Sequence, residues 1–236
     1  MMKTLAFIPA RAGSVGIPNK NTQRLGDRPL YQWALGAALN TQGIDHTVLS
    51  TDIPDLDVSR LSRENSFEIH KRPAHLTNGL SYTITDVVLD YLNTNAATYD
   101  LVALFQPTSP FVQPAQVEAC IDTLTMYEGG LSYNSAQTIC EIPHNYHAFN
   151  QRVLKGDSVE FAFRQERDEF PHKQDKPVFY KFGNMVVARV SHLYPGKSMF
   201  PGPCWSYMVD WKHAMDIDTP GDLELANLMY GMELIP

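Results

Sequence analysis

Cysteine is scarce in this 236-residue chain. Cys120, Cys140 and Cys204 are an odd number of cysteines with wide spacing, which argues against a disulfide framework and against a zinc ribbon. Nothing beside Cys204 marks an activating base, so a nucleophilic role is not indicated. We therefore expect all three cysteines to pack inside a protein of a reducing compartment.

Long hydrophobic runs and basic clusters are also missing. No stretch approaches the ~18 apolar residues that cross a bilayer, and Pro9 and Arg11 end the short apolar run at the N-terminus. The formal net charge is -7 and no run of Lys or Arg exceeds two residues, so the basic surface typical of nucleic-acid binding is absent. These features predict a cytoplasmic protein that binds neither a membrane nor nucleic acid. An anionic small molecule stays possible, because a few cations in a cleft can outweigh an acidic exterior.

The remaining pattern is that of an α/β protein. Short apolar runs alternate with helix-length amphipathic stretches over residues 1–140, which favours a Rossmann-like, mostly parallel sheet with flanking helices. We expect strands at 5–8, 47–50, 67–70, 101–105 and 131–133, and a β-like segment at 179–190. Helices are expected after Pro29, after Ser81 or Thr83, after Pro114 and at 223–229.

One region interrupts this alternation. From about 134 to 177 the sequence is rich in Pro, His, Asn, charged and aromatic residues without a clear period, which predicts an insertion into a single domain spanning 1–236. His144 and His147 within it have a spacing found among metal ligands, but no third ligand is in view, so we interpret them as structural.

The first expected strand runs into a glycine-containing loop, ARAGSVGIPNKN at 10–21. Gly13 and Gly16 allow close approach of the backbone to a ligand, Ser14 and the loop amides can donate to phosphate oxygens, and Arg11 and Lys20 add positive charge. The spacing matches neither G-x-x-x-x-G-K-[ST] nor G-x-G-x-x-G. The loop is thus either a polyphosphate cradle or a plain turn after a strand.

Three further elements follow expected strands. Ser50-Thr51-Asp52, Arg72-Pro73 and QPTSP at 106–110 each come at a strand's carboxyl end, where ligands bind in open α/β sheets. Asp52 is a candidate for nucleoside contacts or, alternatively, for capping a helix after Pro54. Gln106, held between prolines and the strand, is a candidate partner for a polyol or carboxylate, although a rigid loop is the alternative.

Two aspartates near the end of the chain form a candidate metal site. Asp216 and Asp218 flank Ile217, so on an extended segment both carboxylates point the same way while Ile217 faces the core. Magnesium commonly takes one or two carboxylates together with phosphate oxygens. The alternative is that Asp218 or Thr219 caps a helix beginning near Pro220.

Taken in order, these pieces resemble the acylneuraminate cytidylyltransferase family, the CMP-sialic acid synthetases and relatives for other nine-carbon ulosonic acids. The segments that carry the resemblance are IPARAGSVGIPNKN at 8–21, STD at 50–52, RPAHL at 72–76, QPTSP at 106–110 and DIDT at 216–219. The resemblance implies a Rossmann-like nucleotidyltransferase fold, CTP as donor, an acidic sugar of sialic, legionaminic or pseudaminic type as acceptor, Mg²⁺ as cofactor, and a homodimer formed through the insertion.

The resemblance also implies roles for particular residues. Those that would hold the nucleotide are Ala10, Arg11, Gly13, Ser14, Gly16, Lys20, Asn21 and Arg72. Gln106 would face the sugar, and Asp216 and Asp218 would hold the metal. Lys20 and Arg11 would stabilise charge as the anomeric hydroxyl attacks the α-phosphorus and pyrophosphate leaves, and Asp218 would assist removal of the hydroxyl proton.

The chain departs from the family pattern at several positions. Val15 replaces a usual lysine of the S-K-G loop, and Val112 stands where an arginine is usual. The sugar-binding R-P-N-G segment appears as KFGN at 181–184, so Lys181, with Arg164 or Arg167 from the arm, is the candidate for the substrate carboxylate. A lysine is a point charge rather than a bidentate fork, which would alter substrate preference.

Two other functions are compatible with these departures. One is a sugar nucleotidyltransferase that uses another base or an eight-carbon ulosonic acid, although those relatives usually have R-L-P-G-K in place of GIPNKN. The other is a nucleotide-binding regulatory or scaffolding module that has lost turnover, for which Val15 and Val112 are the motivating features.

Overall fold

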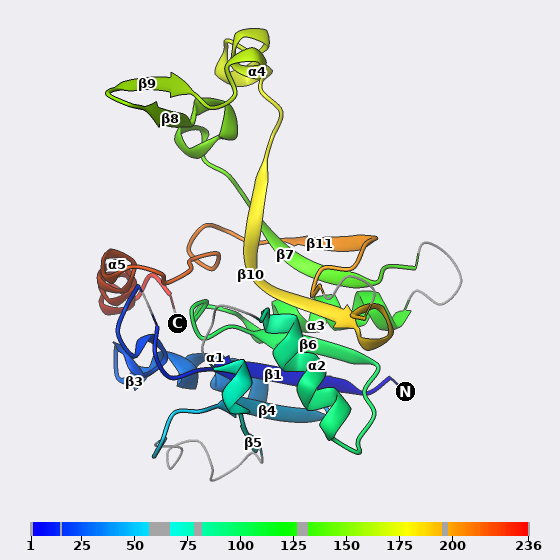
Figure 1. The fold of residues 1–236 in the computed structure, drawn as a ribbon. Coiled ribbons are helices and arrows are strands. Elements are labelled where there is room, and N and C mark those ends of the chain that lie inside the picture. Colours follow the sequence, from blue (N-terminus) through cyan, green and yellow to red (C-terminus); the bar gives the residue numbers. More distant parts are fainter. Residues whose placement is uncertain are drawn as a thin grey trace.

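The computed structural model describes residues 2–14, 16–56, 67–77, 82–126, 132–194 and 198–235. Val15 and Ser81 lie outside these ranges. Within them, the protein is built on a seven-stranded sheet with the strand order β11-β7-β10-β6-β1-β4-β5 (Figure 1). The strands are β1 (Thr4–Ala10), β4 (His46–Thr51), β5 (Glu68–Lys71), β6 (Leu101–Phe105), β7 (Ser135–Glu141), β10 (Tyr180–Arg189) and β11 (Cys204–Met208).

The sheet is mostly parallel, as the sequence predicts. Strand β1 pairs in parallel with both β4 and β6, β4 pairs in parallel with β5, and β7 pairs in parallel with β11. Strand β10 runs antiparallel between β6 and β7. The carboxyl ends of β1, β4, β5 and β6 therefore lie along one rim, and the expected Rossmann-like α/β class is confirmed.

The strand predicted at 131–133 is wrong at residues 132 and 133, and residue 131 lies outside the described ranges. Residues 132 and 133 are not in a strand, and the strand begins at Ser135 instead. Its sequence, SAQTICE, has no continuous apolar run, since it contains the polar residues Ser135 and Thr138. Both are buried, because each has a hydrogen-bond partner inside the protein. A polar strand of this kind gives no hydrophobic signal.

Helices cover both faces of the sheet because alternate strand residues point in opposite directions. Ala6 and Ile8 of β1 pack against α1 (Leu30–Leu39) and α3 (Pro114–Met126), whereas Leu5 and Phe7 pack against α2 (Ile84–Thr94). Helix α5 (Pro220–Gly231) closes a smaller cluster with Leu25, Leu30 and Ile217. Among the described helices, none is long and apolar enough to cross a membrane.

The remaining elements are short. They comprise strands β2 (Arg24–Leu25), β3 (Arg28–Pro29), β8 (Arg152–Lys155) and β9 (Ser158–Phe161), helix α4 (Arg164–Glu169), and the 3-10 helices η1 (Lys20–Thr22), η2 (Ala74–Leu76), η3 (His144–Tyr146), η4 (Ala148–Asn150), η5 (Lys173–Asp175) and η6 (Val190–His192).

The segment between β7 and β10 forms an arm that projects from the body, with β8, β9 and α4 at its far end (Figure 1). The predicted insertion at about 134–177 therefore begins too early, since β7 belongs to the central sheet. The arm has its own aromatic packing around Phe149, which contacts Phe163, Phe170 and Phe179. His147 is buried, stacks on Phe179 with ring centroids 4.6 Å apart, and has its Nε2 2.9 Å from the Pro177 carbonyl oxygen.

Helix α2 begins with a capping box at Thr83 and Asp86. The Thr83 hydroxyl accepts from the Asp86 amide at 3.2 Å, and the Asp86 carboxylate accepts from the Thr83 amide at 2.8 Å. Thr83→Ala should lower the free energy of unfolding by about 1 kcal/mol, because the Asp86 amide loses its acceptor. Urea denaturation measures this loss. Thr94→Ala in the last turn of the same helix is the control and should change stability by less than about 0.5 kcal/mol; equal effects would contradict the capping role.

Candidate functional site

The glycine loop, Arg72, the QPTSP segment and the two aspartates converge on one cleft, whereas Ser50, Thr51 and Asp52 do not line it. Its volume is about 620 Å³, and it lies at the carboxyl ends of β1 and β6. It is lined by Pro9, Arg11, Ser14, Gly16, Lys20, Asn21, Arg72, Tyr82, Ile84, Gln106, Pro107, Thr108, Asp216 and Asp218. Residues separated by most of the chain length thus share one solvent-filled space.

The loop that follows β1 is held in place by side chains that point into it. The buried Asn21 donates from Nδ2 to the Arg11 carbonyl oxygen at 2.8 Å, and the Ala12 amide donates to Asp52 Oδ1 at 2.6 Å. Asp52 therefore anchors the loop, and no helix follows it within the described residues 53–56. Gly13 has a φ of 66°, a conformation that favours glycine.

Gly16 brings the loop against the aspartate segment. A Cβ placed on Gly16 would lie 2.5 Å from the Asp218 carbonyl oxygen, so any side chain here would force the two segments apart. The loop and the aspartates consequently lie side by side and line the same cleft. This is the spatial arrangement on which a joint site for phosphate and metal depends.

Cationic groups line the cleft. The Lys20 ammonium lies 2.8 Å from Asp218 Oδ1; the Lys20 side chain is 14% exposed and that of Asp218 is 69% exposed. Arg72 is 5% exposed and donates from Nη2 to the Ser50 carbonyl oxygen at 3.2 Å. Its buried Nε has no hydrogen-bond partner among the described residues. Burial lowers the pKa of Arg72, while Tyr82 and Asp52 act in the opposite direction, and an arginine stays charged at neutral pH.

The aspartate segment is positioned by the core. Ile217 is fully buried, as predicted, and its amide donates to the Thr108 carbonyl oxygen at 2.8 Å. Helix α5 is capped by Thr219, whose hydroxyl accepts from the Asp222 amide, so the cap is not Asp218. The Asp218 carboxylate is therefore left to face Lys20.

The two carboxylates influence each other. Desolvation by the surrounding protein atoms raises the pKa of the Asp216 carboxyl, although part of the residue is exposed to solvent. The negative charge of Asp218 raises this pKa further. A hydrogen bond from Thr108 and the charges of Lys20 and Lys181 oppose it. Adjacent carboxylates that repel each other favour a shared divalent cation. No group of three or more His, Cys, Asp or Glu suited to a metal occurs in the described parts of the chain, so these two aspartates are the only acidic side chains proposed here for a cation.

Several predicted site residues do not line the cleft. Ala10 is buried at the end of β1, and Gly13 serves the loop conformation. Lys181 lies close enough to Asp216 to affect its pKa, but its ammonium donates to the Ala214 carbonyl oxygen. The nearby Asn184 of the KFGN segment is fully buried.

Arg164 and Arg167 lie on α4 in the arm, apart from the cleft of their own chain (Figure 1). Arg164 is exposed, 3.8 Å from Asp168, and Arg167 lies over the Phe161 ring at 4.3 Å and donates to Asn150 Oδ1 at 2.8 Å. The structure therefore does not bring them together with Gln106 within one chain.

Some cleft residues have no motif of their own. Tyr82 and Ile84 line the cleft without a sequence signal, and the buried Tyr82 hydroxyl has no partner among the described residues. Thr108 lies within the QPTSP segment, in which the sequence predicts a substrate contact only for Gln106. Val112, at the position where a relative would carry arginine, is 5% exposed and packs in the core with α3.

Comparison with known proteins supports a nucleotide-transfer site. Residues 5–201 match the family model described as cytidylyltransferase. The chain is 27% identical over 237 residues to the CMP-N,N'-diacetyllegionaminic acid synthase of Legionella pneumophila, covering 99% of this chain and 97% of that protein. It is 25% identical over 224 residues to the N-acylneuraminate cytidylyltransferase of Escherichia coli, covering 95% of this chain but only 51% of that longer protein.

Two solved structures show the same fold over nearly the whole chain. A CMP:2-keto-3-deoxy-manno-octonic acid synthetase complexed with CTP superposes with a TM-score of 0.70 at 18% identity, covering 98% of this chain and 99% of that one. A 4-diphosphocytidyl-2C-methyl-D-erythritol synthase from Anaerococcus prevotii superposes with a TM-score of 0.65 at 13% identity, covering 97% and 96%. At these identities the likeness establishes the fold. Because the family model spans most of the chain, from 5 to 201, this protein belongs to the cytidylyltransferase family.

Proposed function

We propose that this protein is a magnesium-dependent enzyme that transfers CMP from CTP to an acidic nine-carbon sugar and releases pyrophosphate. The observation that carries the proposal is the cleft in which Lys20 and the glycine loop face Asp216 and Asp218. The names of its relatives, a CMP-N,N'-diacetyllegionaminic acid synthase and an N-acylneuraminate cytidylyltransferase, support an acceptor of the sialic, legionaminic or pseudaminic type.

The triphosphate of CTP would lie along the glycine loop. Ser14 and the loop amides would donate to its oxygens, and Arg11 and Lys20 would balance its charge. Arg72, a buried cation with an unsatisfied Nε, supports an anionic or acceptor-rich ligand beside it. Lys20 would then exchange Asp218 for the phosphates, where it would stabilise the charge that develops as pyrophosphate leaves.

Asp216 and Asp218 would hold Mg²⁺, to which the donor set fits: two hard carboxylates whose mutual repulsion a dication relieves. When bound, the ion would supply positive charge that neutralises part of the charge of the phosphates. Asp218, the more open of the two carboxylates, would accept the proton of the attacking anomeric hydroxyl once Lys20 has moved. Gln106, which lines the same cleft, would orient the sugar.

The arm would complete the site in a homodimer. The β8–β9 hairpin exposes Val153, Leu154 and Val159, a set of apolar side chains that association would cover. Arg164 and Arg167 would then reach the sugar carboxylate bound by the partner subunit, with Lys181 contributing from the body. The cytoplasmic location likewise remains a prediction.

An eight-carbon ulosonic acid is the second candidate acceptor, because the CMP:2-keto-3-deoxy-manno-octonic acid synthetase has the same fold over nearly the whole chain. A nucleotide-binding module without turnover is the third possibility. CTP that binds in the presence of Mg²⁺, measured by calorimetry, while no acceptor yields pyrophosphate would favour such a module.

A substrate panel tests the acceptor and the base. We expect pyrophosphate release with CTP and one of N-acetylneuraminic, legionaminic or pseudaminic acid, and much less with UTP, ATP or GTP, or with the eight-carbon acid. Preferential use of the eight-carbon acid would replace the proposed acceptor without affecting the assignment to the family.

Replacing Lys20 tests the triphosphate site. Lys20→Ala should lower the rate of pyrophosphate release on the order of 10²-fold or more, by analogy with loss of one preorganised donor to a developing charge. Arg28→Ala is the control, because Arg28 forms an ion pair, 3.1 Å from Asp27, outside both the cleft lining and the arm. Near-normal activity of the Lys20 variant would count against the proposed site.

Replacing Asp216 tests the metal site. Asp216→Asn should raise the Mg²⁺ concentration needed for half-maximal activity, because a neutral amide is a weaker ligand. The raised pKa of Asp216 means that protons compete with the metal at a higher pH than for an ordinary aspartate, so the Mg²⁺ requirement of the wild type should rise as the pH is lowered. Magnesium titrations at several pH values check both points. An identical titration curve for the variant would remove Asp216 from the metal site.

A further inference from the structure

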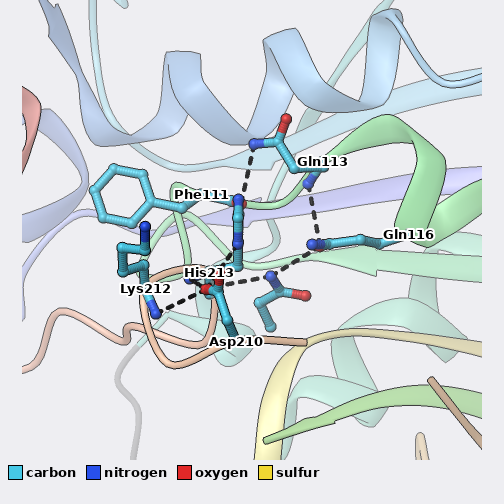
Figure 2. A network of polar contacts seen from close by, with 7 residues as sticks. Phe111, Gln113, Gln116, Asp210, Lys212 and His213 are labelled. Carbon is cyan, nitrogen blue, oxygen red and sulfur yellow. Dashed lines mark hydrogen bonds and ion pairs between the residues drawn. The ribbon is translucent and has the colours of Figure 1, made fainter. Parts of the chain in front are cut away.

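A buried polar network joins β10 and α3 to the turn that precedes the aspartates. Figure 2 shows Gln116 of α3 and the turn formed by Asp210, Lys212 and His213 facing each other. Asn184 connects them: its Nδ2 donates to Gln116 Oε1 at 3.1 Å and to the His213 carbonyl oxygen at 2.9 Å. The proposed reaction gives this network no role.

Asn184 is held in one orientation. Its side chain is fully buried, and its Oδ1 accepts from the Thr138 hydroxyl at 2.9 Å. The backbone amide of Asn184 donates to the same hydroxyl oxygen at 2.8 Å. The register between β10 and β7 shifts between Phe182 and Val186, which makes room for these contacts. A Cβ on Gly183 would lie 2.5 Å from Thr138 Oγ1, so the close approach of the two strands requires glycine.

The turn is fixed from two sides. Within it, Asp210 Oδ1 accepts from the amides of Lys212 and His213 at 3.0 Å each and lies 2.8 Å from His213 Nδ1. From β10, Asn184 donates to the His213 carbonyl oxygen, and Lys181 donates to the next carbonyl oxygen, that of Ala214. Two side chains of one strand thus hold consecutive peptide groups.

The aspartates follow this turn at once. Ala214 is fully buried, and Asp216 comes two residues later. Beyond the turn, Ile217 provides the next anchor through its buried side chain and its bond to Thr108. Without the bonds that hold the 210–214 turn, Asp216 would be fixed only from the side of Ile217.

We propose that Asn184 is a positioning residue, which places Asp216 and Asp218 by fixing the 210–214 turn through the His213 carbonyl oxygen. It touches neither the cleft nor the substrates. The inference rests on the proposed function, because it gives the two aspartates the metal-binding role assigned above. In this role Asn184 makes none of the sugar contacts that the resemblance implies for the KFGN segment.

Asn184→Leu tests the proposal, since it preserves the approximate volume and removes the bonds to Gln116 and His213. Hydrogen exchange of the nucleotide-free protein should be faster in peptides covering 209–219. Mn²⁺ affinity in the presence of CTP and without sugar, measured by electron paramagnetic resonance, should fall by roughly 10-fold or more, as for loss of a residue that orients a metal ligand. Under Mg²⁺ saturation the KM for CTP should stay close to the wild-type value.

Ser135→Ala is the matched control. Ser135 is equally buried, lies on the neighbouring strand β7, and donates to the Pro201 carbonyl oxygen at 2.8 Å, without contact to the turn. It should lower the melting temperature without changing exchange at 209–219 or Mn²⁺ affinity. If Asn184→Leu behaves like this control, the positioning role is refuted, and the same holds if exchange increases while Mn²⁺ affinity stays unchanged.

Gln116→Met provides a second variant in case Asn184→Leu does not fold. It removes the bond from Asn184 to Gln116 but keeps the bond to His213, so the same changes should appear with a smaller magnitude. These measurements do not require turnover. If the wild type releases no pyrophosphate but binds Mn²⁺, and Asp216→Asn abolishes that binding, the proposed reaction is refuted and the positioning role can still be tested. If Mn²⁺ binding does not depend on Asp216, the positioning role is refuted.

Discussion

The cleft depends on the close contact between two segments that lie 198 residues apart, as measured from Lys20 to Asp218. Gly16 lets the backbone of the first segment approach the carbonyl of Asp218, and Lys20 places its ammonium on the carboxylate of the same residue. An ion pair with one partner 69% exposed contributes little to stability. The contact is instead maintained by packing, chiefly the burial of Ile217 and the absence of a side chain at Gly16. The ion pair therefore matters for the electrostatics of the cleft rather than for stability.

The distribution of charge explains how an acidic protein can bind a polyanion. The whole chain has a net charge of -7, yet the glycine loop and the end of β5 bring Arg11, Lys20 and Arg72 to one cleft. The two aspartates line the same space and would repel a nucleotide that arrived without a cation. Such a site suits a triphosphate accompanied by a dication, and it suits free anions less well.

Strand β10 links the site to the arm. It leaves the arm, enters the sheet antiparallel to its neighbours, and passes the 210–214 turn, which it contacts through Lys181 and Asn184 (Figure 1). One continuous strand therefore connects the arm with the turn beside the aspartates.

The sequence alone determined the α/β class, the strands β1, β4, β5 and β6, and the segments that line the cleft, because these features arise from local periodicity and from the rule that parallel strands end at one rim. It also predicted that Ile217 is buried between two outward-facing carboxylates. Only the tertiary structure decided that Asp52 anchors the loop, that Tyr82 borders the cleft and that Asn184 is buried. These depend on contacts between residues distant in sequence, and a polar strand such as β7 becomes recognisable only when its partners satisfy its buried hydroxyls.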